Sequence, residues 1–185
     1  MADIIPLTET DAAGRVQLIQ EATQIFFETA HIKVFESPSA QDAFYERWFG
    51  HYLKTDPASF LLAIDANGSA IGYLAGCLDS FSEAARIIIG DISLYTPAFC
   101  AALRDHPSHL HINVKPGYQG KGVGRQLISG FLRLCRDKGA RGIHVVTGAE
   151  SRAVNFYRST CGFTPFTVPD AAPDLAVLVY AIPAP

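Results

Sequence analysis

The segment KPGYQGKGVGRQL, residues 115–127, contains four glycines and three basic side chains and runs directly into an apolar helical pattern. The strand-like run 109–114 precedes it. A strand, a glycine-rich turn and a helix start form an anion site, because the first N–H groups of a helix are unpaired and its dipole adds positive charge. Glycines at 120, 122 and 124 would let the backbone approach phosphate oxygens where a Cβ would block them. We therefore expect a ligand that carries phosphate.

The basic residues of this segment are Lys115, Lys121 and Arg125, which either serve a ligand with several phosphates or remain solvated charges near a helix start. Two familiar phosphate loops are excluded by spacing. The nucleotide triphosphatase loop needs a lysine after its last glycine, whereas Val123 follows Gly122. The dinucleotide fingerprint G-x-G-x-x-G fails because Arg125 stands where its third glycine is required.

The bulk properties are those of a globular protein. The 185 residues are 49% hydrophobic and 18% charged, with a net charge of −3 and a pI near 6.0. An acidic chain is not expected to bind nucleic acid or a membrane surface generally. The start of the sequence has no secretory pattern, and its four scattered cysteines lack C-x-x-C spacing, so we expect a cytoplasmic protein without disulfides or a zinc site.

The first third of the chain predicts one strand, two helices and a hairpin. A short strand is expected at Ile4–Leu7, and apolar residues recur at helical spacing in 11–29, for which Thr8 or Thr10 could be the cap, and in Ala40–Tyr52. Two strand-like runs then flank Ala66-Asn67-Gly68. Asn-Gly between such runs is a strong signal for an antiparallel hairpin.

The middle of the chain, Asp79–Pro107, has a poor pattern and is interpreted as an irregular insertion, with a short strand at Ile87–Ile89 and a helix from Pro97 through Arg104. Regular elements follow in the order strand, glycine loop, helix, strand, helix and two strands. The later ones are expected at 142–147, about 151–160, from 163 and at 175–181. This order indicates an α/β fold with a sheet of mixed direction and helices on its faces.

The spacing Gln119-x-x-Gly122-x-Gly124 after Val114-Lys-Pro116 resembles the acetyl-coenzyme A loop of the GNAT acyltransferase superfamily. Downstream, Asn-Phe-Tyr at 155–157 followed by Gly-Phe at 162–163 is similar to the second signature of that family. The resemblance covers roughly the whole chain and implies a single domain, 1–185, with a GNAT-type mixed, mostly antiparallel sheet and helices on both faces. Within the superfamily, the insertion and the sequence HLHINVKPGYQGKGVGRQLI that follows it resemble the acetyltransferase-like domain of O-GlcNAc hydrolases and its free-standing bacterial relatives.

The resemblance also implies acetyl-coenzyme A as cosubstrate and an N-acetyltransferase activity. Backbone groups of the strand before the loop would bond the pantetheine arm and the thioester, and the loop amides would take the pyrophosphate. The residues so implied are Ile112, Asn113, Val114, Gln119, Gly120, Lys121, Gly122, Val123, Gly124 and Arg125. Asn155 either contacts the cofactor or is an exposed helix residue.

Tyr157 is the implied general acid, which would protonate the departing thiolate, and the alternative is a tyrosine that packs on the sheet. Four residues separate its Phe-Tyr pair from Gly162, whereas the family usually has three. Glu150 stands where many members carry Asn. Both differences affect the direction in which the Tyr157 hydroxyl would point. Since no cysteine lies in the loop or on the proposed acid helix near Tyr157, direct transfer without an acetyl-enzyme is implied.

The general base has several candidates. His109 and His111 alternate with apolar residues and would share one face of an unbulged strand, where a neutral imidazole could accept the ammonium proton. Many relatives carry Glu at the position of Ser108. Asp79 and Glu83 are alternatives that could instead hold a cationic acceptor.

The spacing His106-x-x-His109-x-His111 also raises a metal site, but no companion ligand has suitable spacing, and no metal is expected. The acceptor could be a small amine, a peptide amino terminus or a protein lysine. A different function class is a non-catalytic acetyl-coenzyme A-binding or protein-interaction module with the same fold. The insertion could form the wall of an acceptor pocket or a homodimer contact.

Overall fold

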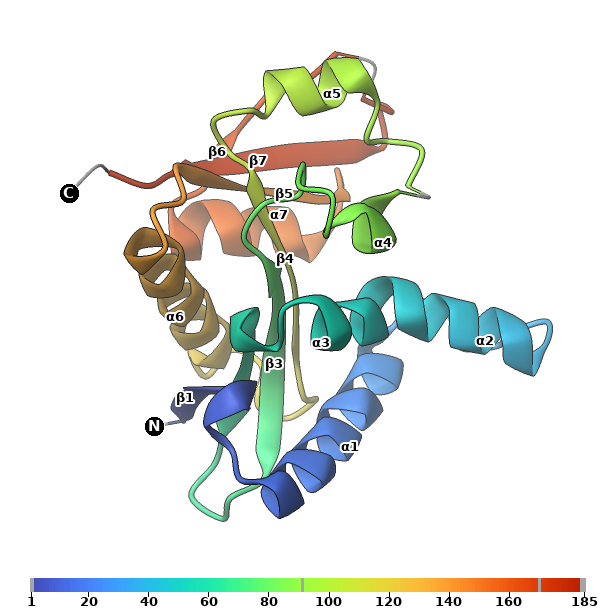
Figure 1. Ribbon diagram of the computed structural model, residues 1–185, viewed down its shortest axis with the longest axis vertical. Helices are drawn as coiled ribbons and strands as arrows, with labels where there is room; N and C mark the ends of the chain where they lie inside the picture. The colour runs from blue at the N-terminus through green and yellow to red at the C-terminus, as the bar shows by residue number, and fades with distance from the viewer. Residues whose placement is uncertain (1, 91, 170, 184–185) are drawn as a thin grey trace. The chain divides into compact units, whose positions relative to one another are not determined.

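The computed structural model describes residues 2–90, 92–169 and 171–183 (Figure 1). These residues form two compact units. The first unit comprises the chain up to Gly76 together with His111–Phe131, and the second comprises Cys77–Leu110 and the chain from Leu132 onward. None of the described helices is both long enough and apolar enough to cross a membrane.

The first unit is built on an antiparallel arrangement of β1 (Asp3–Pro6), β2 (Phe60–Ile64) and β3 (Ala70–Cys77). The expected hairpin is confirmed, with Leu62 opposite Tyr73. Next to β3 lies β4 (Ser108–Val114), whose last four residues belong to this unit.

Several helical elements precede β2 in the first unit, and the side chains of Asp11 and Ser37 cap two of them. These elements are the 3₁₀ turn η1 (Leu7–Glu9), α1 (Ala12–Thr29), α2 (Pro38–Tyr45), the π-helical turn η2 (Glu46–Gly50), α3 (His51–Thr55) and the 3₁₀ turn η3 (Pro57–Ser59). The expected cap of α1 at Thr8 or Thr10 is wrong, because the Asp11 carboxylate accepts the hydrogen bond from Gly14 N–H at 2.7 Å. The second expected helix is present but is interrupted by η2.

Helices cover both faces of β3, as Figure 1 shows for α1 and α6 (Val123–Asp137). Tyr73 packs edge-on against Phe49 of η2, with ring centroids 4.9 Å apart. Its neighbour Gly72 points the other way, since a Cβ there would lie 3.4 Å from the Leu127 side chain of α6. The alternation of β-strand side chains thus assigns one face of β3 to each layer of helices.

The second unit continues the sheet with β5 (Gly142–Gly148), β6 (Thr164–Pro165) and β7 (Leu175–Ala181). Strand β5 pairs in parallel with β4 at Ser108 and His109, and it pairs antiparallel with β7 along its whole length. Strand β6 pairs antiparallel with β7. Over the described residues the strand order is β1-β2-β3-β4-β5-β7-β6. This is the mixed, mostly antiparallel α/β sheet that the sequence predicts.

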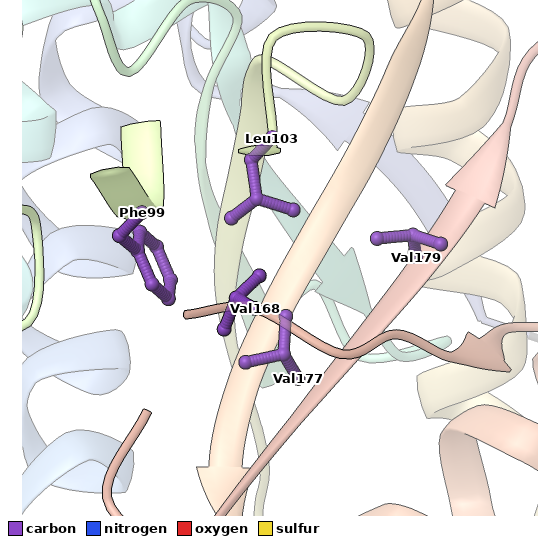
Figure 2. Close-up of a cluster of buried hydrophobic side chains, with 5 residues drawn as sticks. All are labelled: Phe99, Leu103, Val168, Val177 and Val179. Carbon is purple, nitrogen blue, oxygen red and sulfur yellow. The ribbon is translucent and has the colours of Figure 1, made fainter. Parts of the chain in front are cut away.

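The helices of the second unit are short: α4 (Arg86–Ile89), α5 (Pro97–Ala102), α7 (Arg152–Asn155) and the π-helical turn η4 (Phe156–Thr160). The strand expected at Ile87–Ile89 is wrong, because Gly90 N–H closes a helical hydrogen bond to Arg86 C=O at 2.8 Å. Figure 2 shows the buried cluster formed by Phe99 of α5, Leu103, Val168, and Val177 and Val179 of β7, in which Val168 lies next to Phe99.

Candidate functional site

The glycine loop has the backbone conformation that only glycine adopts easily. Gly117, Gly120 and Gly122 have φ angles of 86°, 73° and 84°. A Cβ on Gly117 or Gly120 would meet no atom within 4 Å, and one on Gly122 would meet only the Gln126 amide nitrogen at 3.9 Å. The space in front of these glycines is therefore open, and a side chain at any of them would intrude into it.

Helix α6 starts at the end of this loop. Gln126 N–H donates to Gly122 C=O at 3.0 Å, the first hydrogen bond of the helix. The N–H groups of Val123, Gly124 and Arg125 precede that bond, so no helical carbonyl is available to them. Gly124 lies in this first turn and is not among the glycines with positive φ, so the conformational argument holds for Gly120 and Gly122 but not for Gly124.

Side chains of the loop brace it from within the first unit. The Gln119 side-chain amide donates to Val114 C=O at 3.0 Å, which fixes the start of the loop to the end of β4. Tyr118 O–H donates to Asp65 in the β2–β3 hairpin at 3.4 Å, and the Lys121 ammonium lies 5.4 Å from the centre of the Tyr118 ring. Sequence reasoning did not identify Tyr118 or Asp65, because 53 residues separate them.

The loop also carries positive charge that is not neutralised by protein carboxylates. Among the described residues, no ion pair involves Lys115, Lys121 or Arg125. Lys121 and Arg125 are exposed, and Lys115 is half-buried. Open glycine backbone, unpaired helix N–H groups and three available cations fit a ligand with several phosphate groups.

The strand that leads into the loop is held tightly against β3. Lys115 N–H donates to Ile71 C=O at 2.9 Å, and the Asn113 side-chain amide donates to the Tyr73 hydroxyl at 2.7 Å. A Cβ on Gly72 would lie 3.1 Å from Asn113 C=O, so glycine permits this close approach. The Asn113 side chain is thus already engaged, which leaves backbone groups of residues 112–114 as the candidates for ligand contact.

His111 lies in an aromatic surrounding in the first unit. Its ring centroid is 6.2 Å from that of Trp48 and 6.3 Å from those of Phe26 and Tyr73. Burial lowers the pKa of His111 to about 4, against a smaller opposing effect of a hydrogen bond to the Trp48 backbone. The buried Nδ1 has no hydrogen-bond partner among the described residues. Nδ1 of His111 is therefore a buried polar atom that is available to a ligand.

His109 belongs to the second unit and to a buried polar network. Its Nδ1 lies 2.6 Å from the Ser80 hydroxyl, which itself lies 2.6 Å from Pro107 C=O. Because Ser80 has one proton to donate and a carbonyl can only accept, Nδ1–H of His109 is the donor to Ser80. His144 is fully buried beside it, with ring centroids 5.8 Å apart.

His144 is held on both sides. Its Nδ1 lies 2.6 Å from His106 C=O and its Nε2 lies 2.9 Å from the Tyr95 hydroxyl. The carbonyl requires a proton on Nδ1, so Tyr95 donates to Nε2. Burial lowers the pKa of His144 to about 4 and also raises the pKa of Tyr95. This network fastens the segment around Tyr95 to β5.

Tyr157 and Asn155 also belong to the second unit. Tyr157 is buried at 6% exposure within η4, between the rings of Phe156 and Phe163. Burial, followed by the charge of Cys161, raises its pKa. Cys161 directly follows η4, and the four cysteines, all of which the structure describes, form no disulfide. Asn155 is exposed and accepts a hydrogen bond from Ser159.

The extra residue between Phe-Tyr and Gly162 coincides with the π-helical turn η4. A π turn contains one more residue than an α turn, so the backbone absorbs the insertion locally. Phe163 N–H then bonds Tyr157 C=O at 3.0 Å, and Gly162 has a φ of 78°. The altered spacing is thereby confined to one turn.

The remaining sequence candidates are less enclosed. Asp79 and Glu83 are both exposed, and the Asp79 carboxylate accepts a hydrogen bond from Phe81 N–H. The described residues contain no cluster of three or more histidine, cysteine or acidic side chains that could hold a metal ion.

Comparison with solved structures supports the fold assignment. The chain is similar to the protein SsHAT (TM-score 0.71, 17% identity, 98% of each chain covered) and to a phosphinothricin acetyltransferase of the GNAT superfamily from Sinorhizobium meliloti in complex with AcCoA (0.59, 17%, 98% of this chain and 88% of that one). It is also similar to a chain of the NatC complex bound to Gag peptide and CoA (0.61, 13%, 98% and 99%). A sequence comparison with curated proteins gives no significant match. The family model described as Acetyltransferase (GNAT) family matches residues 17–163, and the chain therefore belongs to this family.

Proposed function

We propose that this protein transfers an acetyl group from acetyl-coenzyme A directly to an amine. The open glycine loop at the start of α6 carries the proposal, since it supplies unpaired N–H groups and three cations without carboxylate partners. Membership of the GNAT family adds support. A narrower relationship to the acetyltransferase-like domain of O-GlcNAc hydrolases stays a prediction from the loop sequence.

The donor would be held by the first unit. Backbone N–H groups from Gln119 to Arg125 would bind the pyrophosphate, with the Lys121 and Arg125 side chains near its charge. Backbone groups of Ile112, Asn113 and Val114 would bond the pantetheine arm and the thioester carbonyl. Bound acetyl-coenzyme A supplies an activated acetyl thioester.

Tyr157 is the proposed general acid. Its raised pKa keeps the phenol protonated throughout the physiological range, which is the state that a proton donor to a thiolate needs. The side-chain amide of Asn155 is a second proposed contact for the donor. Its oxygen already accepts a hydrogen bond from Ser159.

The proposed base is one of the two histidines of β4. His111 is neutral above pH 4 and has an unpaired Nδ1, so it could take a proton from the amine nitrogen once a side chain beside it moves. Its low pKa makes it a weak base, better suited to a proton that becomes acidic during attack than to one on a free ammonium. His109 already donates through Nδ1 to Ser80. Turnover of His111→Gln and His109→Gln, followed against pH, distinguishes them.

Direct transfer can be tested at Cys161, the thiol closest in sequence to Tyr157. If the amine attacks the thioester itself, Cys161→Ser keeps turnover, and intact-protein mass spectrometry after incubation with donor alone shows no added acetyl group. Lost turnover together with an acetyl adduct on the wild type would instead establish a covalent intermediate.

Calorimetric titration with acetyl-coenzyme A tests the donor site first. We expect saturable binding by the wild type and none by Gly122→Glu, because the side chain would enter the open space of the loop and add negative charge. Gly139→Glu is the matched control, since Gly139 also has positive φ (73°) and open space but lies outside the loop. The left-handed conformation costs a non-glycine residue about 1–2 kcal/mol, so both variants carry similar strain.

The alternative function is a module that binds acyl-coenzyme A without turnover. Both functions predict donor binding, so the discriminating measurement is release of free thiol that depends on an added amine. Acceptors to be screened include small amines, peptide amino termini and lysine side chains. A folded protein that fails to bind the donor would exclude both the enzyme and the acyl-coenzyme A module.

A further inference from the structure

The segment between α1 and α2 exposes apolar side chains. Val34 is 87% exposed and Ile32 is 37% exposed, and they are two of the large hydrophobic residues that the described surface leaves in water. Two hollows, of about 530 and 440 Å³, both have Ile32, Val34, Phe35 and Glu36 in their walls. An exposed apolar segment beside hollows of ligand size is typical of a binding site.

The smaller hollow is named here the Trp48 pocket. Its walls are mainly apolar and include the rings of Phe35, Phe44 and Trp48. Phe35 and Phe44 are in contact, with ring centroids 5.3 Å apart. The charged residues among its lining are Glu36 and Arg47.

Trp48 connects this pocket to the strand that leads into the glycine loop. The centroid of its ring lies 6.2 Å from that of His111. The unpaired Nδ1 of His111 is thus beside a residue that also lines the pocket. A buried polar atom without a partner costs about 1–3 kcal/mol, a cost that an amine, which can both donate and accept hydrogen bonds, would remove.

We propose that the Trp48 pocket binds the apolar group of the acceptor, and that the acceptor is a primary amine with a single aromatic or branched aliphatic substituent. This inference rests on the proposed acetyl transfer. The substituent packs among Phe35, Phe44 and Trp48, and the amine is directed to the His111 side of Trp48.

The charges around the segment favour a monoamine over a polyamine or a lysine-rich peptide. Lys33, in the wall of the larger hollow, already donates to the carbonyls at the end of α1, at 2.7 Å to Glu28 and 3.2 Å to Phe27. Glu36 and Arg47 both line the Trp48 pocket, so a ligand with several ammonium groups would find one carboxylate and a competing cation there. An apolar monoamine carries one ammonium group and does not require a second carboxylate.

The chain contains a single tryptophan, so its fluorescence reports on this pocket without any need for turnover. The experiment titrates the full-length protein, saturated with coenzyme A, with 2-phenylethylamine, ethanolamine or spermidine and follows Trp48 emission. We expect 2-phenylethylamine to change the emission saturably and to bind at least about tenfold more tightly than the other two amines, because it buries an aromatic ring.

Two exposed valines provide matched variants that leave the core untouched. Val34 lines the pocket, whereas Val16 is 60% exposed on α1 and lines neither hollow. Val34→Ser should lower the affinity for 2-phenylethylamine about threefold, while Val16→Ser should leave this affinity unchanged. Equal affinity for all three amines, or equal effects of the two variants, would overturn the proposal.

Failure of this inference can be told from failure of the proposed function. Acetylation of ethanolamine and 2-phenylethylamine with equal kcat/KM would keep the transferase and exclude the apolar pocket. Saturable binding of 2-phenylethylamine at Trp48, without acetylation of this amine or of any other screened acceptor, would keep the pocket and exclude the transferase. If sedimentation shows a dimer that Val34→Ser dissociates, and no amine changes Trp48 emission, the segment is a contact between copies and the proposal is wrong.

Discussion

At the scale of single residues, glycine has two different roles in this chain. In the loop, positive φ angles require it at Gly117, Gly120 and Gly122, and the loop pattern predicted the last two. In β3, close packing requires it, because a Cβ on Gly76 would lie 2.2 Å from the Phe131 ring. Nothing in the local sequence of β3 predicts this, since Phe131 is 55 positions further on.

Replacement of Gly76 tests this packing. Gly76→Ala should lower the free energy of unfolding by about 1–3 kcal/mol, because Phe131 is fully buried and cannot move aside without strain. Gly148→Ala is the control, since its nearest non-local atom lies at an ordinary 3.8 Å. Urea unfolding measures both. The smaller side chain in Gly76→Ala/Phe131→Leu should recover part of the loss, and a double variant less stable than both singles would contradict the steric explanation.

Tyr157 allows a residue-scale test of the catalytic proposal. With an accepted amine, Tyr157→Phe should lower kcat at least about tenfold while the affinity for acetyl-coenzyme A changes little, because only the proton donor is removed. The raised pKa also predicts that no loss of activity up to pH 9 arises from Tyr157 ionisation. Unchanged kcat in the variant would show that Tyr157 only packs between its aromatic neighbours.

At the scale of elements, the differences between prediction and structure have local causes. The run Arg86–Ile89 contains three isoleucines, which favour a strand by propensity, but it forms a single helical turn. Helix 40–52 was expected to be continuous, yet η2 widens it at Trp48. Both π turns, η2 and η4, contain residues to which we assign a functional role, Trp48 and Tyr157, in keeping with the frequent occurrence of π turns at functional sites.

The segment 79–107 is irregular in sequence, and the bond from Tyr95 to His144 is one of those that hold it to β5. Tyr95→Phe should lower the free energy of unfolding by about 1–3 kcal/mol, because it leaves the Nε2 acceptor of His144 buried and unpaired. Tyr118→Phe is the matched control, since it loses a longer bond, 3.4 Å, to the exposed Asp65 hairpin and should change stability by less than about 0.5 kcal/mol. Thermal unfolding of both variants measures the difference. Equal effects would mean that the hydrogen bond from Tyr95 to His144 stabilises the fold no more than the bond from Tyr118 to Asp65.

At the scale of the whole molecule, each unit contains a histidine whose pKa burial lowers to about 4, His111 in the first and His144 in the second. An unfolded histidine has a pKa near 6.5, so between pH 6.5 and 4 the unfolded chain binds more protons than the folded one. Stability from these groups is therefore complete above pH 6.5 and is lost as the pH falls toward 4.

Chemical denaturation at pH 7.5, 6.0 and 5.0 should show this decline. His144→Gln should be less stable at pH 7.5, because it disturbs the bonds to Tyr95 and His106, but its stability should fall less steeply with acid. A slope equal to that of the wild type would show that His144 does not contribute to the acid sensitivity of the protein.

The sequence by itself determined the order of the strands and helices outside the segment 79–107, the hairpin at Asn67-Gly68, the glycine loop and the family. These features depend on periodicity, turn chemistry and backbone conformation, which act over a few residues. Only the tertiary structure decided what surrounds His111 and that Tyr95 bonds His144. Burial and unpaired atoms are created when residues from distant parts of the chain pack together. The pKa values and pockets that give those residues their chemistry are therefore absent from any local pattern.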